Sequence, residues 1–235
     1  MVEKINVPRH VAIIPDGNRT WARKHEMSLE KTYEKGIKKI GEVAKWCRKH
    51  RIKMLTMWGF SMENFQRDRQ EVDKLFILFK KFLFDGLKRM DKEKKKEKNE
   101  VRIRFFGRRD LLPEKVAKLM KDVEDRTRKN RPYQLNLLLA YGGHAEIIDG
   151  VNRAIREGVK MVDEKSFERF LPTGEIPPPD LIIRTSGMKR LSGFLPWQSA
   201  YSELYFSNVL WPDFSKEDFE SALRDYAKKI RKFGR

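Results

Sequence analysis

The chain has 235 residues, of which 40% are hydrophobic and 37% are charged, and its net charge is +18. This length suits one domain with a packed core, and the apolar content excludes a disordered chain. The longest apolar runs, such as residues 54–60, are shorter than the ~20 residues of a membrane-spanning helix. Residues 1–9 contain no apolar signal-peptide core, and the single cysteine, Cys47, cannot form an internal disulfide. We therefore expect one domain over residues 1–235 in the cytoplasm, with Cys47 in the core.

The positive charge favours anionic partners, which include nucleic acids, phospholipid surfaces and phosphorylated small molecules. Basic runs at residues 92–98 and 228–232 are typical of solvated helix faces. No basic run is interleaved with aromatic residues as in a single-strand binding groove, and no zinc-finger spacing occurs. We therefore expect no nucleic-acid partner, whereas peripheral contact with an anionic membrane stays open beside a plain solvated surface.

Strand-like apolar segments alternate with longer segments of helical periodicity along the chain. In chain order they predict a strand at 10–14, a helix at 29–50, a strand at 52–60, a long helix at 69–98, a strand at 101–107, a helix at 113–129, a strand at 134–140, a helix at 144–157, a short helix at 164–170, strands at 180–184 and 203–206, and a helix at 216–232. Six strands separated by crossover helices predict an α/β fold with a mostly parallel six-stranded sheet covered on both faces.

Ligands of such sheets bind beyond the carboxyl ends of the strands. The segments that follow four of the predicted strands, at residues 15–18, 60–64, 141–144 and 185–187, are rich in small or polar residues. Because parallel strands end at the same edge, these segments are expected to converge there.

The long helix carries an apolar stripe at spacings of three and four residues: Val72, Leu75, Phe76, Phe79, Phe82, Leu83 and Leu87. Such a stripe is typical of a packed core. Its wide aromatic face could also line an elongated apolar pocket.

The first candidate for chemistry is the segment Asp16, Gly17 and Asn18, which follows the first strand and precedes a possible helix start at Thr20 and Trp21. Backbone amides at a helix start favour a phosphate, and a carboxylate binds a hard cation, so a Mg²⁺-bound diphosphate would use both groups. A simple turn is the alternative, because Asp-Gly and Gly-Asn are common turn dipeptides.

The second candidate is the loop after the fifth strand, where Arg184, Lys189, Arg190 and Ser192 lie within nine residues. Arginine provides paired donors to phosphate, so this loop could hold a diphosphate, with a solvated basic loop as the alternative. Glu203 begins the last strand, where a carboxylate is more often a strand-edge residue than a metal ligand.

The third candidate combines aromatic and polar groups after the second strand: Phe60, Ser61, Met62, Glu63, Asn64, Phe65 and Arg67. This set could contact both an apolar chain and its phosphate. The sequence contains no nucleophile triad pattern, histidine metal pair, P-loop or dinucleotide-binding motif.

Together these segments resemble the cis-prenyltransferase family, also called the undecaprenyl diphosphate synthase family. The similar stretches are residues 10–18, 60–67, 135–143, 180–187, 190–206 and 210–214, and they occur in the family's order along nearly the whole chain. The resemblance implies a homodimeric α/β enzyme that condenses isopentenyl diphosphate with an allylic prenyl diphosphate in Z geometry, with Mg²⁺ assisting. It also implies an apolar product tunnel between the sheet and the long helix.

The resemblance assigns roles to individual residues. Asp16 would be catalytic and hold the metal with Glu203, and Asn64 would be the catalytic proton relay. The allylic substrate and the reacting groups would contact Gly17, Asn18, Arg19, Thr20, Trp21, Ser61, Met62, Glu63, Phe65 and Arg67. The isopentenyl diphosphate would contact Arg184, Arg190, Leu191 and Ser192.

The chain departs from the family pattern on the allylic side. Thr20 and Leu29 occupy positions where the family has arginine, and Tyr33 occupies that of a histidine. Because hydrogen bonds to charged groups contribute about 1.5–3 kcal/mol each, the loss is substantial unless Arg19, Arg23 or Lys24 compensates. Two alternatives therefore stay open: an altered prenyl coupling, or a supporting subunit of a heteromeric enzyme.

Overall fold

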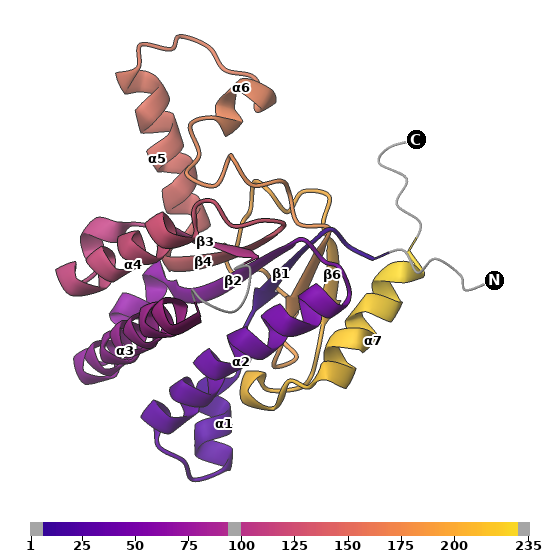
Figure 1. Ribbon diagram of the computed structural model, residues 1–235. Helices are drawn as coiled ribbons and strands as arrows, with labels where there is room; N and C mark the ends of the chain where they lie inside the picture. The colour runs from indigo at the N-terminus through magenta and orange to yellow at the C-terminus, as the bar shows by residue number, and fades with distance from the viewer. Residues whose placement is uncertain (1–6, 94–99, 230–235) are drawn as a thin grey trace.

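The computed structural model describes residues 7–93 and 100–229. Within them, six strands form one sheet in the order β3-β4-β2-β1-β5-β6, and all neighbouring strands are parallel. The strands are β1 (His10–Ile14), β2 (Met54–Ser61), β3 (Val101–Phe106), β4 (Tyr133–Tyr141), β5 (Leu181–Arg184) and β6 (Glu203–Phe206) (Figure 1). The predicted α/β fold with a six-stranded parallel sheet is confirmed.

Helices connect the strands and cover the sheet (Figure 1). They are α1 (Asn18–Lys24), α2 (Leu29–Lys49), α3 (Arg69–Glu93), α4 (Glu114–Thr127), α5 (Gly143–Arg156), α6 (Glu164–Glu168) and α7 (Lys216–Ala227), with the 3₁₀ helices η1 (Met62–Gln66), η2 (Arg109–Leu111) and η3 (Trp211–Asp213). No helix in the described ranges is long and apolar enough to cross a membrane.

Alternating residues of β1 enter two different cores. Val11 and Ile13 pack with the apolar faces of α2, α3, α4 and α7, whereas Ala12 and Ile14 pack with Phe194 on the other side of the sheet. Burial on both faces explains why the strand is a continuous apolar run rather than an alternating one. The predicted burial of Cys47 is confirmed, and burial raises the pKa of its thiol.

The last helix and the helix predicted at 113–129 end earlier than predicted, the latter at Thr127. The predicted helix 216–232 ends at Ala227, where the amides of Lys228 and Lys229 donate to the carbonyls of Asp225 and Tyr226 and tighten the last turn. The long helix is described to Glu93, and the rest of its predicted range, within 94–99, lies outside the described residues, as does 230–232.

A buried polar row crosses the centre of the sheet through β1, β2 and β4. His10 Nε2 lies 2.8 Å from Thr56 Oγ1, which accepts from Asn136 Nδ2 at 3.0 Å. His10 Nδ1 lies 2.8 Å from the carbonyl of Pro177, so this nitrogen carries the proton of a neutral ring. Burial lowers the pKa of His10 from 6.5 to about 4, although hydrogen bonds to the backbone and the charge of Asp180 act in the opposite direction.

The low pKa of His10 predicts a loss of stability in mild acid. As the pH falls from 6.5 towards 4, the unfolded chain binds a proton at His10 before the folded chain does, which lowers the free energy of unfolding by about 3 kcal/mol. Urea unfolding across this range, compared with His10→Gln, measures the effect. A pH dependence that is the same in both proteins would contradict it.

Candidate active site

Four chain segments meet at the carboxyl edge of the sheet, as the parallel topology requires. The loops after β1, β2, β4 and β5 all begin there. Hydrogen bonds join the loops directly, since the amide of Asp16 donates to Thr185 Oγ1 and the amide of Gly143 donates to the carbonyl of Gly193. The predicted convergence is confirmed.

Asp16 and Arg184 form an ion pair at the centre of this edge. Arg184 Nη2 donates to Asp16 Oδ2 at 2.8 Å, and the side chain of Arg184 is 6% exposed whereas that of Asp16 is 36% exposed. The second carboxylate oxygen accepts from the amide of Gly17 at 2.7 Å. Thr185 Oγ1 also donates to the Asp16 carbonyl, so the carboxylate is fixed while part of it stays open to solvent.

The loop after β5 wraps around the Arg184 guanidinium. Arg184 Nη1 donates to Ser192 Oγ at 2.8 Å and to the carbonyl of Arg190. Arg184 Nε is buried and has no hydrogen-bond partner among the described residues. The Arg190 side chain is exposed, and Leu191 packs against the core on the Phe194 side. The loop therefore presents two exposed cations, Lys189 and Arg190, and one buried donor, Arg184 Nε, without a partner among the described residues.

Left-handed backbone conformations concentrate in these loops. Gly17 has a φ of +104°, and a Cβ there would lie 2.8 Å from Leu210 Cδ2. Ser186 and Ser192 also have positive φ, at 73° and 53°, which is uncommon for residues with side chains. Backbone strain of this kind persists where packing enforces it and clusters at functional sites.

The segment after β2 forms a capped 3₁₀ turn. Ser61 and Asn64 make a reciprocal capping box, in which Asn64 Oδ1 accepts from the Ser61 amide at 3.1 Å. The Asn64 amide nitrogen forms no hydrogen bond with another described residue, so it is available as a donor. Phe65 packs edge-on against Phe60, with ring centroids 4.9 Å apart, while Met62 is half-buried and Glu63 is exposed.

A buried carboxylate that the sequence analysis missed organises the neighbouring basic residues. Glu71 on α3 has a side chain that is 9% exposed, and its Oε1 accepts from Tyr33 at 2.7 Å and from Arg67 at 3.2 Å. Arg67 also donates to the Tyr33 hydroxyl at 3.2 Å, and Arg19 Nε lies 3.9 Å from Glu71 Oε2. Burial and the hydrogen bond to Glu71 raise the pKa of Tyr33. Arg67 has extended backbone before α3 begins, and Arg19 and Tyr33 are far from Glu71 in sequence, so no local pattern indicated this cluster.

The beginning of α1 completes the edge. Asn18 Nδ2 donates to the carbonyl of Pro15 at 3.2 Å, whereas its Oδ1 is buried without a partner in the described chain. Trp21 is buried and stacks on His25, and Lys35 Nζ lies 4.2 Å from the centroid of the Trp21 ring. Thr20 is exposed.

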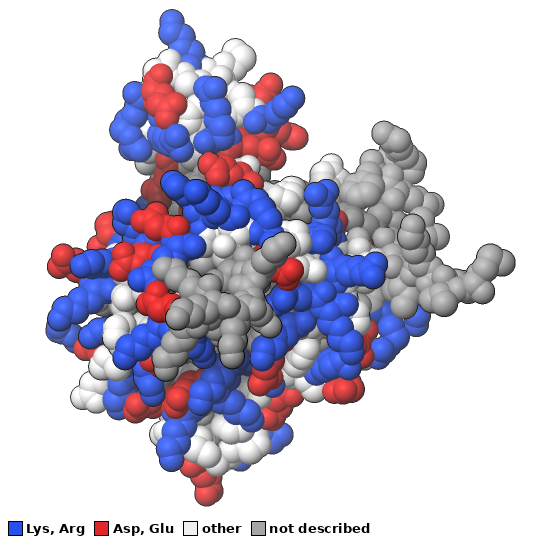
Figure 2. All heavy atoms as spheres, viewed as in Figure 1, with Lys and Arg blue, Asp and Glu red and all other residues white. Residues whose placement is uncertain are grey.

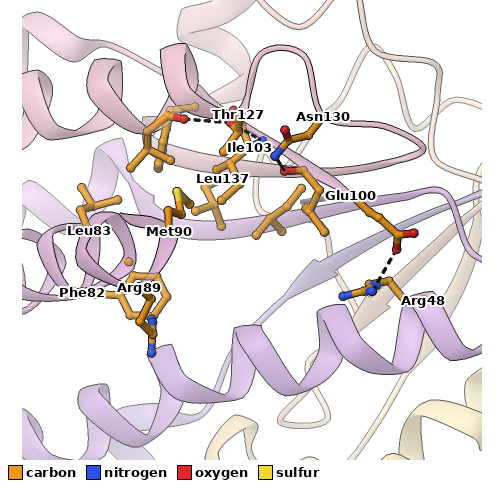
Figure 3. A pocket seen from close by; sticks show the side chains of 15 residues that line it. Arg48, Phe82, Leu83, Arg89, Met90, Glu100, Ile103, Thr127, Asn130 and Leu137 are labelled. Carbon is orange, nitrogen blue, oxygen red and sulfur yellow. Dashed lines mark hydrogen bonds and ion pairs between the residues drawn. The ribbon is translucent and has the colours of Figure 1, made fainter. Parts of the chain in front are cut away.

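Two cavities lie in the layer between the sheet and α2 and α3. The first, of about 100 Å³, is lined by Pro15 and Asn18, which flank Asp16 and Gly17 in the chain, and by residues that include Tyr33, Arg67, Leu75 and Phe79. The second, of about 270 Å³, lies farther along α3, where Phe82, Leu83 and Met90 oppose Ile103 and Leu137 of the sheet (Figure 3). The apolar stripe of α3 therefore both fills the core and lines cavities, but a continuous tunnel is not seen among the described residues.

The structure does not bring Glu203 to this edge. Glu203 begins β6 and pairs in register with Leu181, whereas the carboxyl edge lies at Arg184 and Phe206, about 10 Å farther along the strands. Its carboxylate forms an ion pair with Lys229 at 3.2 Å. The described residues contain no cluster of three or more metal-ligating side chains. Within one chain, Asp16 and Glu203 therefore do not lie together, as the predicted metal site with both carboxylates would require.

A family model described as putative undecaprenyl diphosphate synthase matches residues 14–234. The chain belongs to this family.

Individual relatives agree with the family model. A tritrans,polycis-undecaprenyl-diphosphate synthase (geranylgeranyl-diphosphate specific) of Thermoplasma acidophilum is 42% identical, over 100% of this chain and 92% of that protein. An isoprenyl transferase of Thermus thermophilus is also 42% identical, over 100% and 91% of the two chains. The crystal structure of lavandulyl diphosphate synthase from Lavandula x intermedia in complex with dimethylallyl diphosphate has a TM-score of 0.90 and 31% identity, covering 97% of this chain and 99% of the other.

The protein is therefore a prenyltransferase of the cis-prenyl diphosphate synthase type, and the predicted family is confirmed. The comparisons give no support to an altered coupling or a supporting subunit as its main activity. They name no residue roles, so the assignments to individual side chains stay predictions.

The Glu71 cluster predicts a measurable contribution to stability. Glu71→Gln removes the charge that separates Arg19 from Arg67, and the free energy of unfolding should fall by about 1–3 kcal/mol. Urea unfolding measures the loss, with Glu34→Gln as a control because Glu34 forms ion pairs with Lys38 and Lys81 at a more exposed position. Equal losses in the two variants would show that the buried cluster has no special role.

Proposed function

We propose that this prenyltransferase condenses isopentenyl diphosphate with geranylgeranyl diphosphate, or a similar allylic diphosphate, to form a Z-polyprenyl diphosphate. Family membership implies the two substrate classes, and the name of the Thermoplasma acidophilum relative supports the choice of primer. The observation that carries the proposal is the Asp16–Arg184 pair, in which Asp16 lies in the loop after β1 and its neighbouring residues Pro15 and Asn18 line a cavity together with apolar side chains of α2 and α3. Such a site can hold a diphosphate at the edge and a hydrocarbon inside.

Prenyl diphosphate synthases in general use a divalent metal, and the geometry at Asp16 is compatible with Mg²⁺. Mg²⁺ takes one or two protein carboxylates and fills its other positions with water and substrate phosphates. Asp16 supplies one partly exposed carboxylate, and the described residues near it provide no larger cluster, which suits this habit. Asp16 would hold the metal, which when bound would stabilise charge on the diphosphate leaving group. Glu203 is left out of this site.

The loop after β5 would bind isopentenyl diphosphate. Arg184 Nε is a buried donor without a partner, and the exposed side chain of Arg190 lies on the same loop. Ser192 Oγ holds the Arg184 guanidinium in place while its own hydroxyl hydrogen is available to a phosphate oxygen. A preorganised set of donors of this kind stabilises negative charge without reorganising during the reaction.

The allylic diphosphate would bind on the α1 and α3 side. Arg19 and Arg67 converge on Glu71 there, and the Tyr33 hydroxyl occupies the position where the family pattern has histidine. Of the residues expected to compensate for the departures at Thr20 and Leu29, the cluster contains Arg19. Gly17, Asn18 and Trp21 would border the diphosphate, and Ser61 and Phe65 would orient the reacting carbons.

Asn64 is proposed to relay the proton that leaves the isopentenyl group. Its amide oxygen is held by the Ser61 amide, which fixes the side-chain plane, and its amide nitrogen faces no described hydrogen-bond partner. The hydrocarbon would grow into the apolar layer, where movement of the Phe79 and Phe82 rings would join the two cavities.

An incorporation assay tests the function. Labelled isopentenyl diphosphate with Mg²⁺ and dimethylallyl, geranyl, farnesyl or geranylgeranyl diphosphate should give products that differ by one isoprenoid unit, with geranylgeranyl diphosphate used best. Asp16→Asn should lower the turnover by at least about 100-fold because it removes the charge that holds the metal. Asp125→Asn, at an exposed position on α4, is the control and should keep full turnover. An Asp16→Asn enzyme that is folded and active would exclude the proposed role.

We also propose that the protein is a homodimer built on α5. Ile148, Val151 and Ile155 lie on this helix at spacings of three and four residues, and they are 56%, 40% and 66% exposed. Helix α5 projects from the body of the molecule (Figure 1), so the stripe is accessible to a second copy. A two-fold interface buries the same stripe of both copies.

Analytical ultracentrifugation tests the dimer. Ile155→Glu should shift the protein to monomers at micromolar concentration, because two buried charges would face each other across the interface. Ile77→Glu is a matched control, since Ile77 is 63% exposed on α3, and it should leave the dimer intact. A dimer that persists in Ile155→Glu would place the interface elsewhere.

A further inference from the structure

A third hollow, distinct from the two cavities described above, lies at the edge of the sheet opposite to Asp16. It has a volume of about 420 Å³, and its lining includes four cationic residues, Arg9, Lys53, Arg102 and Arg131. Arg9, Lys53 and Arg131 precede β1, β2 and β4, and Arg102 lies near the beginning of β3. The parallel topology therefore gathers these four cations at the amino ends of the strands. We call this hollow the basic pocket.

The charge of the basic pocket is not neutralised within the described chain. None of its four cations forms an ion pair with a carboxylate in residues 7–93 or 100–229. Arg131 donates to backbone carbonyls, and Lys53 Nζ lies 4.8 Å from the centroid of the Tyr133 ring. Burial and the nearby guanidinium groups of Arg104 and Arg131 lower the pKa of Arg102, although the charges of Glu175 and Glu124 act in the opposite direction.

The acidic side chains around the pocket are already engaged. Glu175 pairs with Arg104 at 3.0 Å, and Glu100 pairs with Arg48 at 3.0 Å. Asp180 Oδ2 accepts from the backbone amides of Arg9 and His10. These carboxylates offset part of the positive charge, and the four cations of the pocket leave an excess that can attract an external anion.

The apolar cavity of about 270 Å³ lies near the same edge but on the opposite face of the sheet. Its lining includes Val101 and Ile103 of β3, whereas Arg102, between them in the strand, lines the basic pocket. Arg48 connects the two, because it pairs with Glu100 of the apolar cavity (Figure 3) and lies 5.8 Å from the Tyr133 ring of the basic pocket. Lys and Arg side chains also gather over the carboxyl end of α2 on the face shown in Figure 2.

We infer that the basic pocket docks the protein on the surface of a membrane that contains anionic phospholipids, with lipid phosphates bound among its four cations. A bilayer that meets this edge offers phosphate to the cations on one face of the sheet and hydrocarbon to the apolar cavity on the other face. A nucleic acid would match only the charge. The biological reason rests on the proposed function, because a polyprenyl product that fills the apolar layer would reach the bilayer at this edge.

Vesicle binding tests the inference without any turnover. The full chain is sedimented with vesicles of phosphatidylcholine alone or of phosphatidylcholine with phosphatidylglycerol, at physiological ionic strength. The wild type should bind the anionic vesicles and not the neutral ones. The triple variant Lys53→Gln, Arg102→Gln, Arg131→Gln should bind at least about tenfold more weakly, since each basic residue near an anionic surface contributes to attraction.

A matched variant separates the pocket from net charge. Lys80→Gln, Lys115→Gln, Lys118→Gln removes the same charge from exposed positions on α3 and α4, and it should bind anionic vesicles like the wild type. Equal loss in both triple variants would overturn the inference in favour of unspecific attraction. Unchanged binding in the pocket variant would also overturn it.

Two further experiments distinguish a membrane from other anionic ligands. Inorganic phosphate at constant ionic strength should not release the protein from vesicles, and release at millimolar phosphate would assign the pocket to a free phosphate compound. An oligonucleotide that competes with the vesicles through the same three residues would assign it to nucleic acid. Condensation activity in detergent should be the same in the pocket variant and the wild type. If the wild type shows no condensation, the proposed function is refuted, whereas the vesicle binding still tests the docking surface.

Discussion

The ion pair between Asp16 and Arg184 holds the carboxyl edge of the sheet together. The two residues follow or end adjacent parallel strands, and the buried guanidinium needs a nearby negative charge because an unpaired buried ion is costly. Thr185 and Ser192 then hold the two partners through their hydroxyl groups. A phosphate that approaches this edge meets a carboxylate suited to a metal and donors suited to oxygen, so the interaction that stabilises the loops also prepares the site.

On the α3 side of the edge the charges are reversed, because here a carboxylate rather than a guanidinium is the central group. There a single buried carboxylate, Glu71, gathers two arginines and a tyrosine hydroxyl from α1, α2 and the segment after β2. One negative charge for two positive ones leaves a net positive site. An incoming diphosphate would complete the charge balance, whereas without Glu71 the arginines would repel each other and lose their common orientation.

Much of the fold could be predicted because its signals are local. The apolar run of β1 and the three- and four-residue spacing of α3 each reflect burial of one element against its neighbours. The four loops at the carboxyl edge were found because parallel topology alone brings them together. By contrast, the cluster around Glu71 depends on side chains far apart in sequence. In the sequence, Tyr33 only replaces a histidine of the family pattern, whereas in the structure its hydroxyl donates a hydrogen bond to Glu71. Glu203 lies in a stretch that resembles the family pattern, and the sequence therefore suggested that it shares a site with Asp16. Its place at the beginning of β6 separates the two residues within one chain.

The parallel sheet gives the molecule two chemically different ends. All six strands run in one direction, so residues that follow strands and residues that precede them form separate edges. The carboxyl edge combines a carboxylate with cations and therefore suits a metal-bound diphosphate. The amino edge has cations whose neighbouring carboxylates are engaged elsewhere, which suits an anionic surface without a metal. The apolar layer beneath α2 and α3 lies between these edges, and under the proposed function a substrate that is charged at one end would bind with its hydrocarbon in this layer. The direction of the strands thus places two different groups of cations at opposite edges of the sheet, which composition alone could not reveal.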